Sequence, residues 1–465
     1  MTAERLSSGD HNLDAILGGG LLTHSITLLA GAPGSGKTIL AQQYVFHNAA
    51  GERPAVYLTT VSEPLDKVLR YGQTMDFFDP KAVGRTVFYE DLGQPLSADR
   101  LAGVLDRIDT VIREHRPGII AIDSFKALRS YAAADGEFRR FLHSLASRLS
   151  AFPSTSFWIG EYDVGEQTTA PEFAVADAIV SLSSQQPDQR ELRVLQVHKL
   201  RGSSFQSGKH AYRISGHGIE VFPRLADVGR SVGYALDSER VSSGIPALDT
   251  MLRDGFRPGT ATLVAGPTGS GKTLTGLHFI FAGARRGEPG VIATLQENPT
   301  QLERVARGFG WSLTDDKVEL LYRSSVDLYV DQWVYELLAT VERAGARRVL
   351  IDSLNDLAFA AGDQMRYREY LYSLVQRCSR GGVSLLMTYE LADLYQSERL
   401  SEFGISRAAD NVVVLQYLRR RSGLKRTLTV LKTRASTHEP EVREFVIAEE
   451  GIVLGDPVSA DGSAP

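Results

Sequence analysis

The sequence predicts an α/β protein built from two tandem copies of one domain, each a mostly parallel β-sheet flanked by helices. Three observations carry this prediction. Similar segments recur at one fixed spacing, short apolar runs alternate with helical patterns, and each copy has a glycine-rich loop between such a run and a helix. This alternation of buried strands and helices is typical of a parallel sheet that is covered on both faces.

The repeat begins close to the amino terminus. The segment "RLSSGDHNLDAILGGGLL" at 5–22 matches "RVSSGIPALDTMLRDGFR" at 240–257, and the two copies stay 235 residues apart through Lys37 and Lys272. A fixed spacing over a domain-sized segment indicates duplication. The stretch at 223–239 contains glycine, serine and charge with little periodicity, which is typical of a joint. We therefore expect two domains, at 1–228 and 236–455, followed by a flexible tail at 456–465.

The apolar runs are continuous rather than strictly alternating, as expected of strands buried on both faces. Between them lie helical patterns such as "KTILAQQYVFHNAA" at 37–50. Strand, helix and strand in this order form the unit from which parallel sheets are built. The predicted strands lie at 25–31, 55–61, 118–124 and 155–162 in the first copy, and at 261–266, 290–295, 348–353 and 383–390 in the second.

Composition limits the class of protein. The formal net charge of −5 over 465 residues argues against a dedicated nucleic-acid binder, which usually has a basic face. The single cysteine, Cys378, allows no internal disulfide and indicates a reducing compartment. We find no signal peptide and no apolar run near the roughly 20 residues that a membrane span needs. These features predict a cytoplasmic protein with no membrane segment.

The glycine-rich loops, GAPGSGKT and GPTGSGKT, both fit the phosphate-binding pattern G-x-x-x-x-G-K-[ST]. Glycines let backbone N–H groups curl around phosphate oxygens, and the following helix directs its positive end toward them. Lys37 and Lys272 would reach the β- and γ-phosphates of ATP, and Thr38 and Thr273 would bind Mg²⁺. The predicted ATP-binding residues are Gly31, Ala32, Pro33, Gly34, Ser35, Gly36, Lys37 and Thr38 in the first copy, and Gly266, Pro267, Thr268, Gly269, Ser270, Gly271, Lys272 and Thr273 in the second.

An aspartate ends one apolar run in each copy. Asp123 lies in "IIAIDS" and Asp352 in "RVLIDS". An aspartate at the end of a strand often caps a turn or a helix. Beside a phosphate-binding loop, we expect a metal role instead, because a carboxylate there can hold Mg²⁺ with the loop threonine. Asp123 with Thr38, and Asp352 with Thr273, are the predicted metal ligands.

The motifs together resemble the KaiC-like circadian-clock ATPases over residues 4–450. The resemblance rests on "SSG…LD" ahead of each loop, the two loops, the "IDS" strands, "HGIEVFP", and the two segments "LQVHKLRGSSF" and "LTVLKTRASTHEPEVREF". It implies two tandem RecA-like P-loop NTPase domains that bind ATP and Mg²⁺. It also implies a homohexamer with two stacked rings and ATP between adjacent subunits, and a signalling protein as a possible partner.

In this family a pair of glutamates after the second core strand activates the attacking water. The second copy has Gln296 and Glu297 there, whereas the first copy has Val61 and Ser62. Because neither Val61 nor Ser62 can accept a proton as a carboxylate can, we expect the first domain to bind ATP but hydrolyse it poorly. Glu297 is the predicted base of the second domain. A bulge that turns Glu63 into the first site remains open.

Each copy also has a Lys-x-Arg segment, Lys199 to Arg201 and Lys432 to Arg434. Two cations spaced by two residues lie on one face of a strand, and such charges often only protect a solvated sheet edge. The family resemblance implies instead that they reach the γ-phosphate bound to a neighbouring subunit. A cation supplied in this way can raise the rate by about 10³–10⁵.

KaiC-like proteins can phosphorylate an adjacent serine and threonine of their second domain. Ser406 stands at the serine position, and Arg407 replaces the threonine. Gln296 replaces the glutamate that would activate the attacking hydroxyl. We therefore expect ATP hydrolysis, and leave Ser406 as a possible phosphoacceptor of a residual autokinase.

Two other classes of function remain open. The basic run "LRRRSGLKR" at 418–426 suggests a RecA-like ATPase that moves on DNA, although such runs are usually solvated hairpin tips and the first copy has no counterpart. A non-catalytic, nucleotide-bound scaffold for a signalling protein would require Glu297 to be silent.

Overall fold

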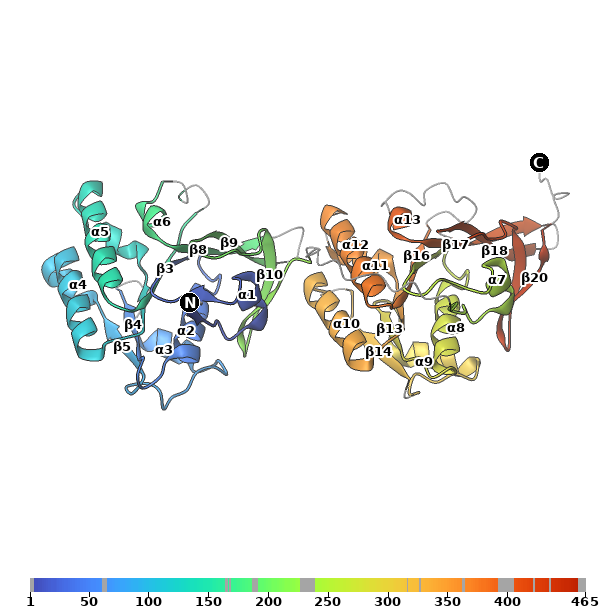
Figure 1. The fold of residues 1–465 in the computed structure, drawn as a ribbon, viewed down its shortest axis with the longest axis horizontal. Coiled ribbons are helices and arrows are strands. Elements are labelled where there is room, and N and C mark those ends of the chain that lie inside the picture. Colours follow the sequence, from blue (N-terminus) through green and yellow to red (C-terminus); the bar gives the residue numbers. More distant parts are fainter. Residues whose placement is uncertain are drawn as a thin grey trace. The chain divides into compact units, whose positions relative to one another are not determined.

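A computed structural model divides the chain into two compact units, Met1–Arg224 and Leu225–Pro465, which are described separately (Figure 1). The structure describes residues 4–60, 65–163, 166, 169–185, 191–225, 239–315, 317–325, 328–361, 364–391, 405–420, 423–434 and 436–458. Among these residues, no helix is long and apolar enough to cross a membrane.

The N-terminal unit contains one large sheet in which the strands run in the order β11-β10-β9-β8-β3-β7-β6-β4-β5. The strands from β8 to β5 are parallel, and β9, β10 and β11 continue the sheet by antiparallel pairing. Two short strands, β1 and β2, pair separately. The bounds are β1 Arg5–Leu6, β2 Leu21–Leu22, β3 Ile26–Gly31, β4 Ala55–Thr59, β5 Val87–Asp91, β6 Ile119–Asp123, β7 Thr155–Gly160, β8 Ala178–Gln185, β9 Leu192–Leu200, β10 Lys209–Ser215 and β11 Gly218–Phe222.

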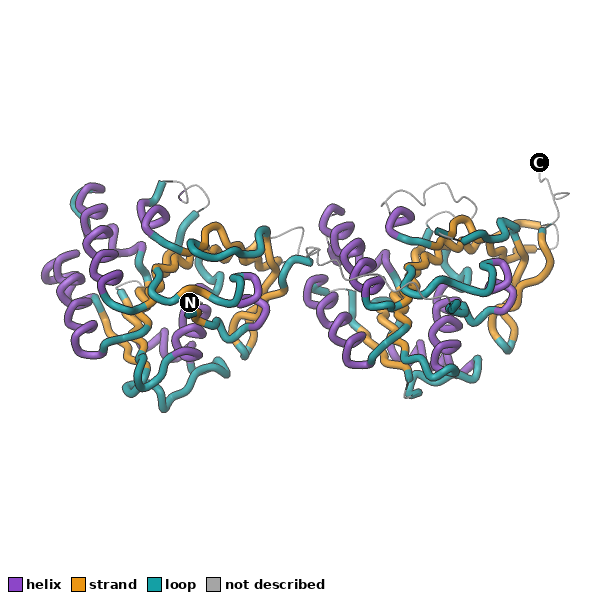
Figure 2. Tube along the Cα trace, in the orientation of Figure 1, coloured by secondary structure: helices purple, strands orange, loops and turns teal. Residues whose placement is uncertain are grey.

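Helices cover both faces of this sheet (Figure 2). Alternate residues of each parallel strand pack into two separate cores, one with α1 and α2 and the other with α4 and α5. This two-sided burial explains the continuous apolar runs. The bounds are α1 His11–Ile16, α2 Lys37–Asn48, α3 Leu65–Gly72, α4 Gly93–His115, the 3₁₀ helix η1 Lys126–Tyr131, α5 Asp135–Ala151 and α6 Pro171–Val175.

The C-terminal unit repeats this topology, with the strand order β14-β13-β15-β16-β12-β17-β18-β19-β20. The strands from β14 to β17 are parallel, and β18, β19 and β20 are added by antiparallel pairing. The bounds are β12 Ala261–Gly266, β13 Gly290–Thr294, β14 Val318–Tyr322, β15 Arg348–Asp352, β16 Ser384–Glu390, β17 Asn411–Arg420, β18 Gly423–Thr433, β19 Arg443–Ala448 and β20 Gly451–Pro457.

The helices of the C-terminal unit again form two layers. The core on one face contains residues of α7, α8 and α9, and the core on the other contains residues of α10, α11 and α12. The bounds are α7 Pro246–Met251, α8 Lys272–Ala284, α9 Pro299–Gly308, α10 Val330–Ala344, α11 Leu354–Ala361, α12 Gln364–Arg380 and α13 Ile405–Ala408.

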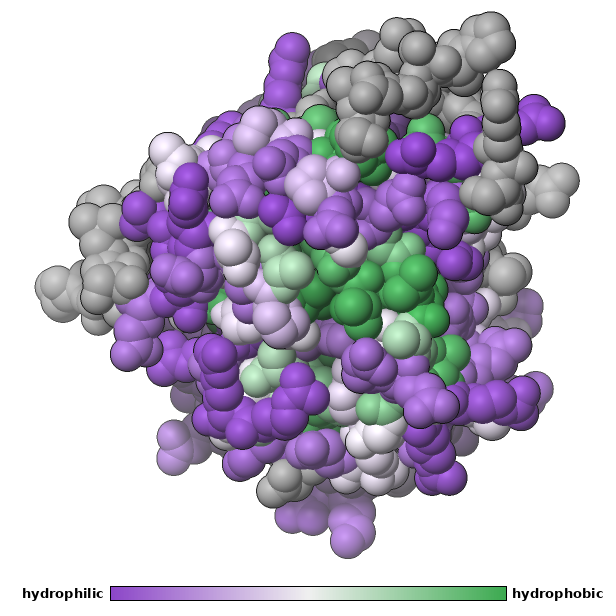
Figure 3. All heavy atoms as spheres, turned by 90° about the vertical axis from the view of Figure 1, so that its right-hand side faces the viewer, coloured by the Kyte–Doolittle hydropathy of each residue, from purple (hydrophilic) through white to green (hydrophobic). Residues whose placement is uncertain are grey.

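An apolar area lies on the side of the C-terminal unit that carries β20, surrounded by polar residues (Figure 3). The strands there expose several large apolar side chains. Val446 of β19 pairs with Val453 of β20, and these side chains are 55% and 37% exposed. Apolar patches with a polar rim often contact other proteins.

The predicted fold class is confirmed, because each unit is a mostly parallel sheet with helices on both faces. All eight predicted strands are present within a few residues of their expected bounds. The antiparallel strands at the end of each sheet were not predicted as such. The last of them, β20, reaches Pro457.

Candidate nucleotide sites

Each glycine-rich loop joins a P-loop strand to a helix at the carboxyl end of the strand. In the N-terminal unit, β3 ends at Gly31 and α2 begins at Lys37. Gly36, at the start of the helix, has φ of 90°, and a Cβ there would lie 2.9 Å from Ile214 and 3.0 Å from Ile219. The positive φ favours glycine here, and a Cβ would also crowd the ends of two isoleucine side chains. The loop and the N–H groups of the helix start form a cradle for phosphate.

The loop lysines lie in equivalent places. Lys37 Nζ donates to the carbonyl of Ala32 at 2.8 Å, and Lys272 Nζ donates to the carbonyl of Pro267 at 2.9 Å. In the C-terminal unit, Glu390 Oε2 lies 3.7 Å from Lys272 Nζ. Burial lowers the pKa of Lys272, against the opposing effect of Glu390. Both lysines are thus largely buried and directed at the loop that would hold the phosphates.

The loop threonine of the N-terminal unit contacts the aspartate that ends β6. Thr38 Oγ1 donates to Asp123 Oδ2 at 2.7 Å, and the hydroxyl of Tyr57 donates to the same oxygen at 2.7 Å. Burial raises the pKa of Asp123, although these two hydrogen bonds oppose the shift. The predicted metal ligands therefore lie side by side.

The C-terminal unit repeats this contact. Thr273 Oγ1 donates to Asp352 Oδ2 at 2.7 Å, and Thr388 donates to the other carboxylate oxygen. Burial again raises the pKa of the aspartate. A carboxylate and a hydroxyl are the hard oxygen ligands that Mg²⁺ prefers. In the described part of the chain the buried loop hydroxyl of Ser270 has no hydrogen-bond partner, which fits a loop whose polar groups bind a ligand.

Glu297 lies in the loop that follows β13 in the C-terminal unit. Among the described residues its buried Oε2 atom has no hydrogen-bond partner, while its backbone N–H donates to Thr294 Oγ1 at 3.2 Å. Burial raises the pKa of Glu297, and the negative charge of Asp352 raises it further. The preceding Gln296 is exposed. A buried carboxylate oxygen without a partner, close to a predicted metal ligand, is available to a water molecule.

The corresponding residues of the first copy, Val61, Ser62 and Glu63, lie outside the described part of the chain. A different carboxylate is present in both units. Glu390 ends β16, and Glu161 directly follows β7. Each of these strands lies between the P-loop strand and the aspartate strand. Neither carboxylate was predicted from the sequence, although a glutamate at or next to the end of the fourth apolar run of each copy was a visible signal.

The Lys-x-Arg segments lie at the opposite end of each sheet from the P-loop of the same unit. Lys199 Nζ donates to the carbonyls of Phe173 and Ala174 at 3.3 Å, and Arg201 pairs with Asp177 at 3.1 Å. Strand β9 runs antiparallel to β8, so its carboxyl end meets the amino end of β3. The six residues of β3 separate these cations from the P-loop by ~17 Å.

The second segment repeats this arrangement. Lys432 Nζ donates to the carbonyl of Ala409 at 2.7 Å, and Arg434 lies 3.5 Å from Asp410. Burial lowers the pKa of Lys432, and the nearby charge of Arg434 contributes. In both units only the lysine belongs to the strand, because the arginine follows its last residue. The structure does not bring these cations to the P-loop of their own unit.

Two arginines that were not predicted from the sequence as site residues support the P-loops. Arg193 of β9 donates to the carbonyl of Gly34 at 2.9 Å, and Arg426 of β18 donates to the carbonyl of Gly269 at 3.3 Å. Arg426 belongs to the basic run that suggested DNA binding. Another member of that run, Arg420, pairs with Glu444 at 3.0 Å. The described part of the run is therefore partly engaged within the unit.

Ser406, the possible phosphoacceptor, belongs to the short helix α13 before β17. Its side chain lies outside the described part of the structure. The carbonyl of the next residue, Arg407, accepts a hydrogen bond from Arg434 at 3.0 Å. The backbone of this helix therefore adjoins the second Lys-x-Arg segment.

Comparisons with known proteins agree with the duplicated fold. A family model described as "ATPase: KaiC" matches residues 6–226 and again residues 241–459. The circadian clock protein KaiC3 of Synechocystis sp. is 28% identical over 471 residues, covering 98% of this chain and 92% of the relative. The circadian clock oscillator protein KaiC of Picosynechococcus sp. is 27% identical over 459 residues, covering 96% of this chain and 88% of the relative.

Proposed function

The chain belongs to the KaiC family of ATPases, and from this premise we propose that it is an ATP-hydrolysing switch whose main hydrolytic site is in the C-terminal unit. One observation carries the proposal. The buried Oε2 of Glu297, which has no hydrogen-bond partner among the described residues, lies near the pair formed by Asp352 and Thr273, at the same end of the sheet as Lys272.

Each of these residues has a role in hydrolysis. Lys272 would bind the β- and γ-phosphates, and Thr273 with Asp352 would hold Mg²⁺, which would supply positive charge beside the phosphate oxygens. Glu297 orients a water molecule toward the γ-phosphorus and accepts its proton as the P–O bond to the β-phosphate breaks. The products are ADP and inorganic phosphate.

The N-terminal unit has the same binding residues but a different task in this proposal. Lys37 and the pair of Thr38 with Asp123 would hold MgATP as in the second site. Val61 and Ser62 supply no carboxylate for the attacking water. We therefore assign this site to tight nucleotide binding with slow hydrolysis, which stabilises subunit assembly.

The positions of the Lys-x-Arg segments support the assembly of subunits into a ring. Lys199 with Arg201, and Lys432 with Arg434, lie too far from their own P-loops to contact a nucleotide there. A head-to-tail neighbour would bring them to its phosphates, and repeated head-to-tail contacts close into a ring. We propose a homohexamer with ATP at the subunit interfaces. The number six comes from the family resemblance.

Subunit mixing tests both hydrolysis and the contact between subunits. The variants Lys272→Ala and Lys432→Ala/Arg434→Ala should each lose most ATP hydrolysis when pure. In an equal mixture, random neighbours restore about one quarter of the interfaces, because an intact loop then meets intact cations. Phosphate release should recover to about that share of the wild-type rate.

A matched mixture provides the control. Lys272→Ala and Glu297→Gln remove groups from the same site of the same subunit, so mixing them restores no complete interface. This mixture should stay inactive. Cations that acted within their own chain would leave the first mixture inactive as well, and that result would contradict the ring.

The output that we propose is signalling or timing, with a signalling protein as a possible partner and the cytoplasm as location. Related chains are named for the circadian clock. Residual autokinase activity at Ser406 is the alternative to this proposal, and Gln296 and Arg407 weaken both partners of that phosphotransfer. A role on DNA has less support, because Arg420 and Arg426 are engaged within the unit. A purely structural scaffold is excluded if phosphate release depends on Glu297.

A further inference from the structure

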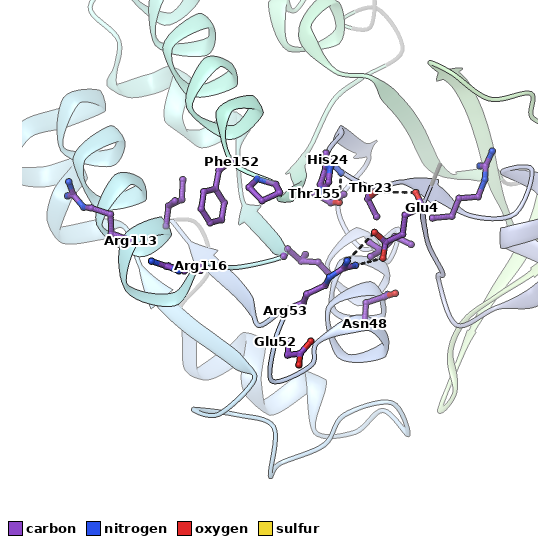
Figure 4. A pocket seen from close by; sticks show the side chains of 16 residues that line it. Glu4, Thr23, His24, Asn48, Glu52, Arg53, Arg113, Arg116, Phe152 and Thr155 are labelled. Carbon is purple, nitrogen blue, oxygen red and sulfur yellow. Dashed lines mark hydrogen bonds and ion pairs between the residues drawn. The ribbon is translucent and has the colours of Figure 1, made fainter. Parts of the chain in front are cut away.

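The N-terminal unit contains a cavity at the amino ends of its parallel strands, away from the P-loop. Its volume is about 830 Å³. Figure 4 shows Arg113, Arg116 and Phe152 on one side of the cavity, and Arg53 with Glu4 on the other. Cavities that bind small molecules commonly have volumes of ~300–1,000 Å³. Its size therefore fits a small organic ligand.

The cavity reflects a difference between the two repeats at one position of the sheet. Ile119 begins β6 and pairs with Ala55, whereas Arg348 begins β15 and pairs with Gly290. Ala55 and Gly290 are 235 residues apart, so Ile119 and Arg348 occupy the same place in the two units.

In the C-terminal unit this place is filled by a long side chain. Arg348 is 1% exposed and donates to the carbonyls of Ser242 and Phe279 at 2.7 and 2.8 Å. It also pairs with Glu288 at 2.7 Å. The guanidinium group and the aliphatic stem therefore occupy the space between the start of β15 and α8.

In the N-terminal unit a smaller residue makes the hydrogen bonds that Arg348 makes in the C-terminal unit. Asn48 Nδ2 donates to the carbonyls of Ser7 and Tyr44 at 2.7 and 2.8 Å. These are the counterparts of the carbonyls that Arg348 satisfies. Gly283 stands at the position of Asn48, and a Cβ there would lie 2.5 Å from Arg348. Asn48 replaces the guanidinium group, and no side chain that the structure describes replaces the aliphatic stem, so the space remains.

The charges around this space are unequal. The lining residues include four arginines and His24, but only two carboxylates, Glu4 and Glu52. Arg53, at the position of Glu288, pairs with Glu4. Among the residues that the structure describes, Arg113 makes only a long hydrogen bond of 3.4 Å to Thr110, and neither it nor Arg116 has a carboxylate partner. The cavity thus has guanidinium groups available at its rim.

The floor of the cavity is apolar. Ile119 is 2% exposed, and Phe152 and Ile112 are half-buried beside it. An apolar floor with a few charged groups at the rim is typical of small-molecule sites. Arginine side chains bind carboxylate and phosphate groups through paired N–H donors.

We propose that this cavity binds a small organic anion. Its carboxylate or phosphate group is held by Arg113 and Arg116, and its apolar ring or chain packs on Phe152 and Ile119. The site is separate from the P-loop, because β3 runs from the cavity side to Gly31 at the other end of the sheet. The cavity also lies at the end of the sheet where Arg201 is found. Asp177 accepts hydrogen bonds there from both Ile26 N and Arg201. A ligand there would lie close to the proposed subunit contact.

Isothermal titration with phenyl phosphate tests this site, in saturating MgATP so that both P-loops are filled. We expect one site per chain in the wild type. Arg113→Glu/Arg116→Glu should weaken binding at least ~10-fold, because like charges then face the phosphate. The matched variant Arg139→Glu/Arg140→Glu changes two exposed arginines of α5 and should bind as the wild type does.

A second variant fills the cavity without changing the charges on α4. Asn48→Gly/Arg53→Glu/Ile119→Arg introduces the residues of the C-terminal repeat, whose packing is already seen around Arg348. It should lose phenyl phosphate binding and keep two MgATP sites per chain, which also reports that the N-terminal unit is folded. The proposal is overturned if the wild type does not bind, if both cavity variants bind normally, or if the α5 control weakens binding equally.

Discussion

Glu297→Gln should lower steady-state phosphate release at least ~100-fold, because general-base catalysis contributes about 10²–10⁴ to such rates. The amide keeps the size of the side chain but cannot accept the proton of the attacking water. MgATP affinity should change little, because the binding groups Lys272, Thr273 and Asp352 remain. Phosphate release and nucleotide binding are measured on the same preparation.

The control for this change is Glu342→Gln, an exposed glutamate on α10 of the same unit. It should hydrolyse ATP at the wild-type rate. If Glu297→Gln kept most of the activity, the base would lie elsewhere. Glu390, 3.7 Å from Lys272, would then be the first residue to change.

The two loop lysines should give unequal losses. Lys272→Ala should lower phosphate release at least ~100-fold, because the cation that stabilises the β- and γ-phosphate charge is removed from the hydrolytic site. Lys37→Ala should keep more than about half of the rate per assembled ring, since the site it disables contributes to assembly rather than to turnover. Light scattering should show that Lys37→Ala assembles less completely at low ATP.

The reverse pattern would contradict the assignment of roles. If Lys37→Ala removed most phosphate release from intact rings, the N-terminal site would be the faster one. Glu161 would then be the described carboxylate to examine in that unit. Equal losses from both substitutions would mean that the two sites share the turnover.

The parallel part of each sheet could be predicted from sequence for a physical reason. Strands buried on both faces form continuous apolar runs, and runs such as 119–123 and 348–352 stand out from the helical patterns around them. The antiparallel strands are different. β19 and β20 expose side chains such as Val446 on one face, so their mixed patterns are weaker signals.

The residues of the site that belong to sequence motifs could be predicted, and the residues outside those motifs could not. The contact of Thr38 with Asp123 follows from two short motifs whose strands lie close together in this fold. The support of Gly269 by Arg426 depends on the antiparallel order of β17 and β18, which no motif encodes. The cavity depends on residues that differ at equivalent positions of the repeat, chiefly Ile119 in place of Arg348 and Asn48 in place of Gly283. Predicting such features requires knowledge of the register of the sheet, which the sequence motifs do not supply.

We propose that the C-terminal site hydrolyses ATP with Glu297 as base and forms no stable phosphoprotein. A time course with γ-labelled ATP tests it most directly, with free phosphate and protein-bound label counted in the same samples of wild type and Glu297→Gln. We expect free phosphate from the wild type, almost none from the variant, and no labelled protein. Label on the protein that Ser406→Ala removes, with little free phosphate, would contradict it and would identify the chain as an autokinase.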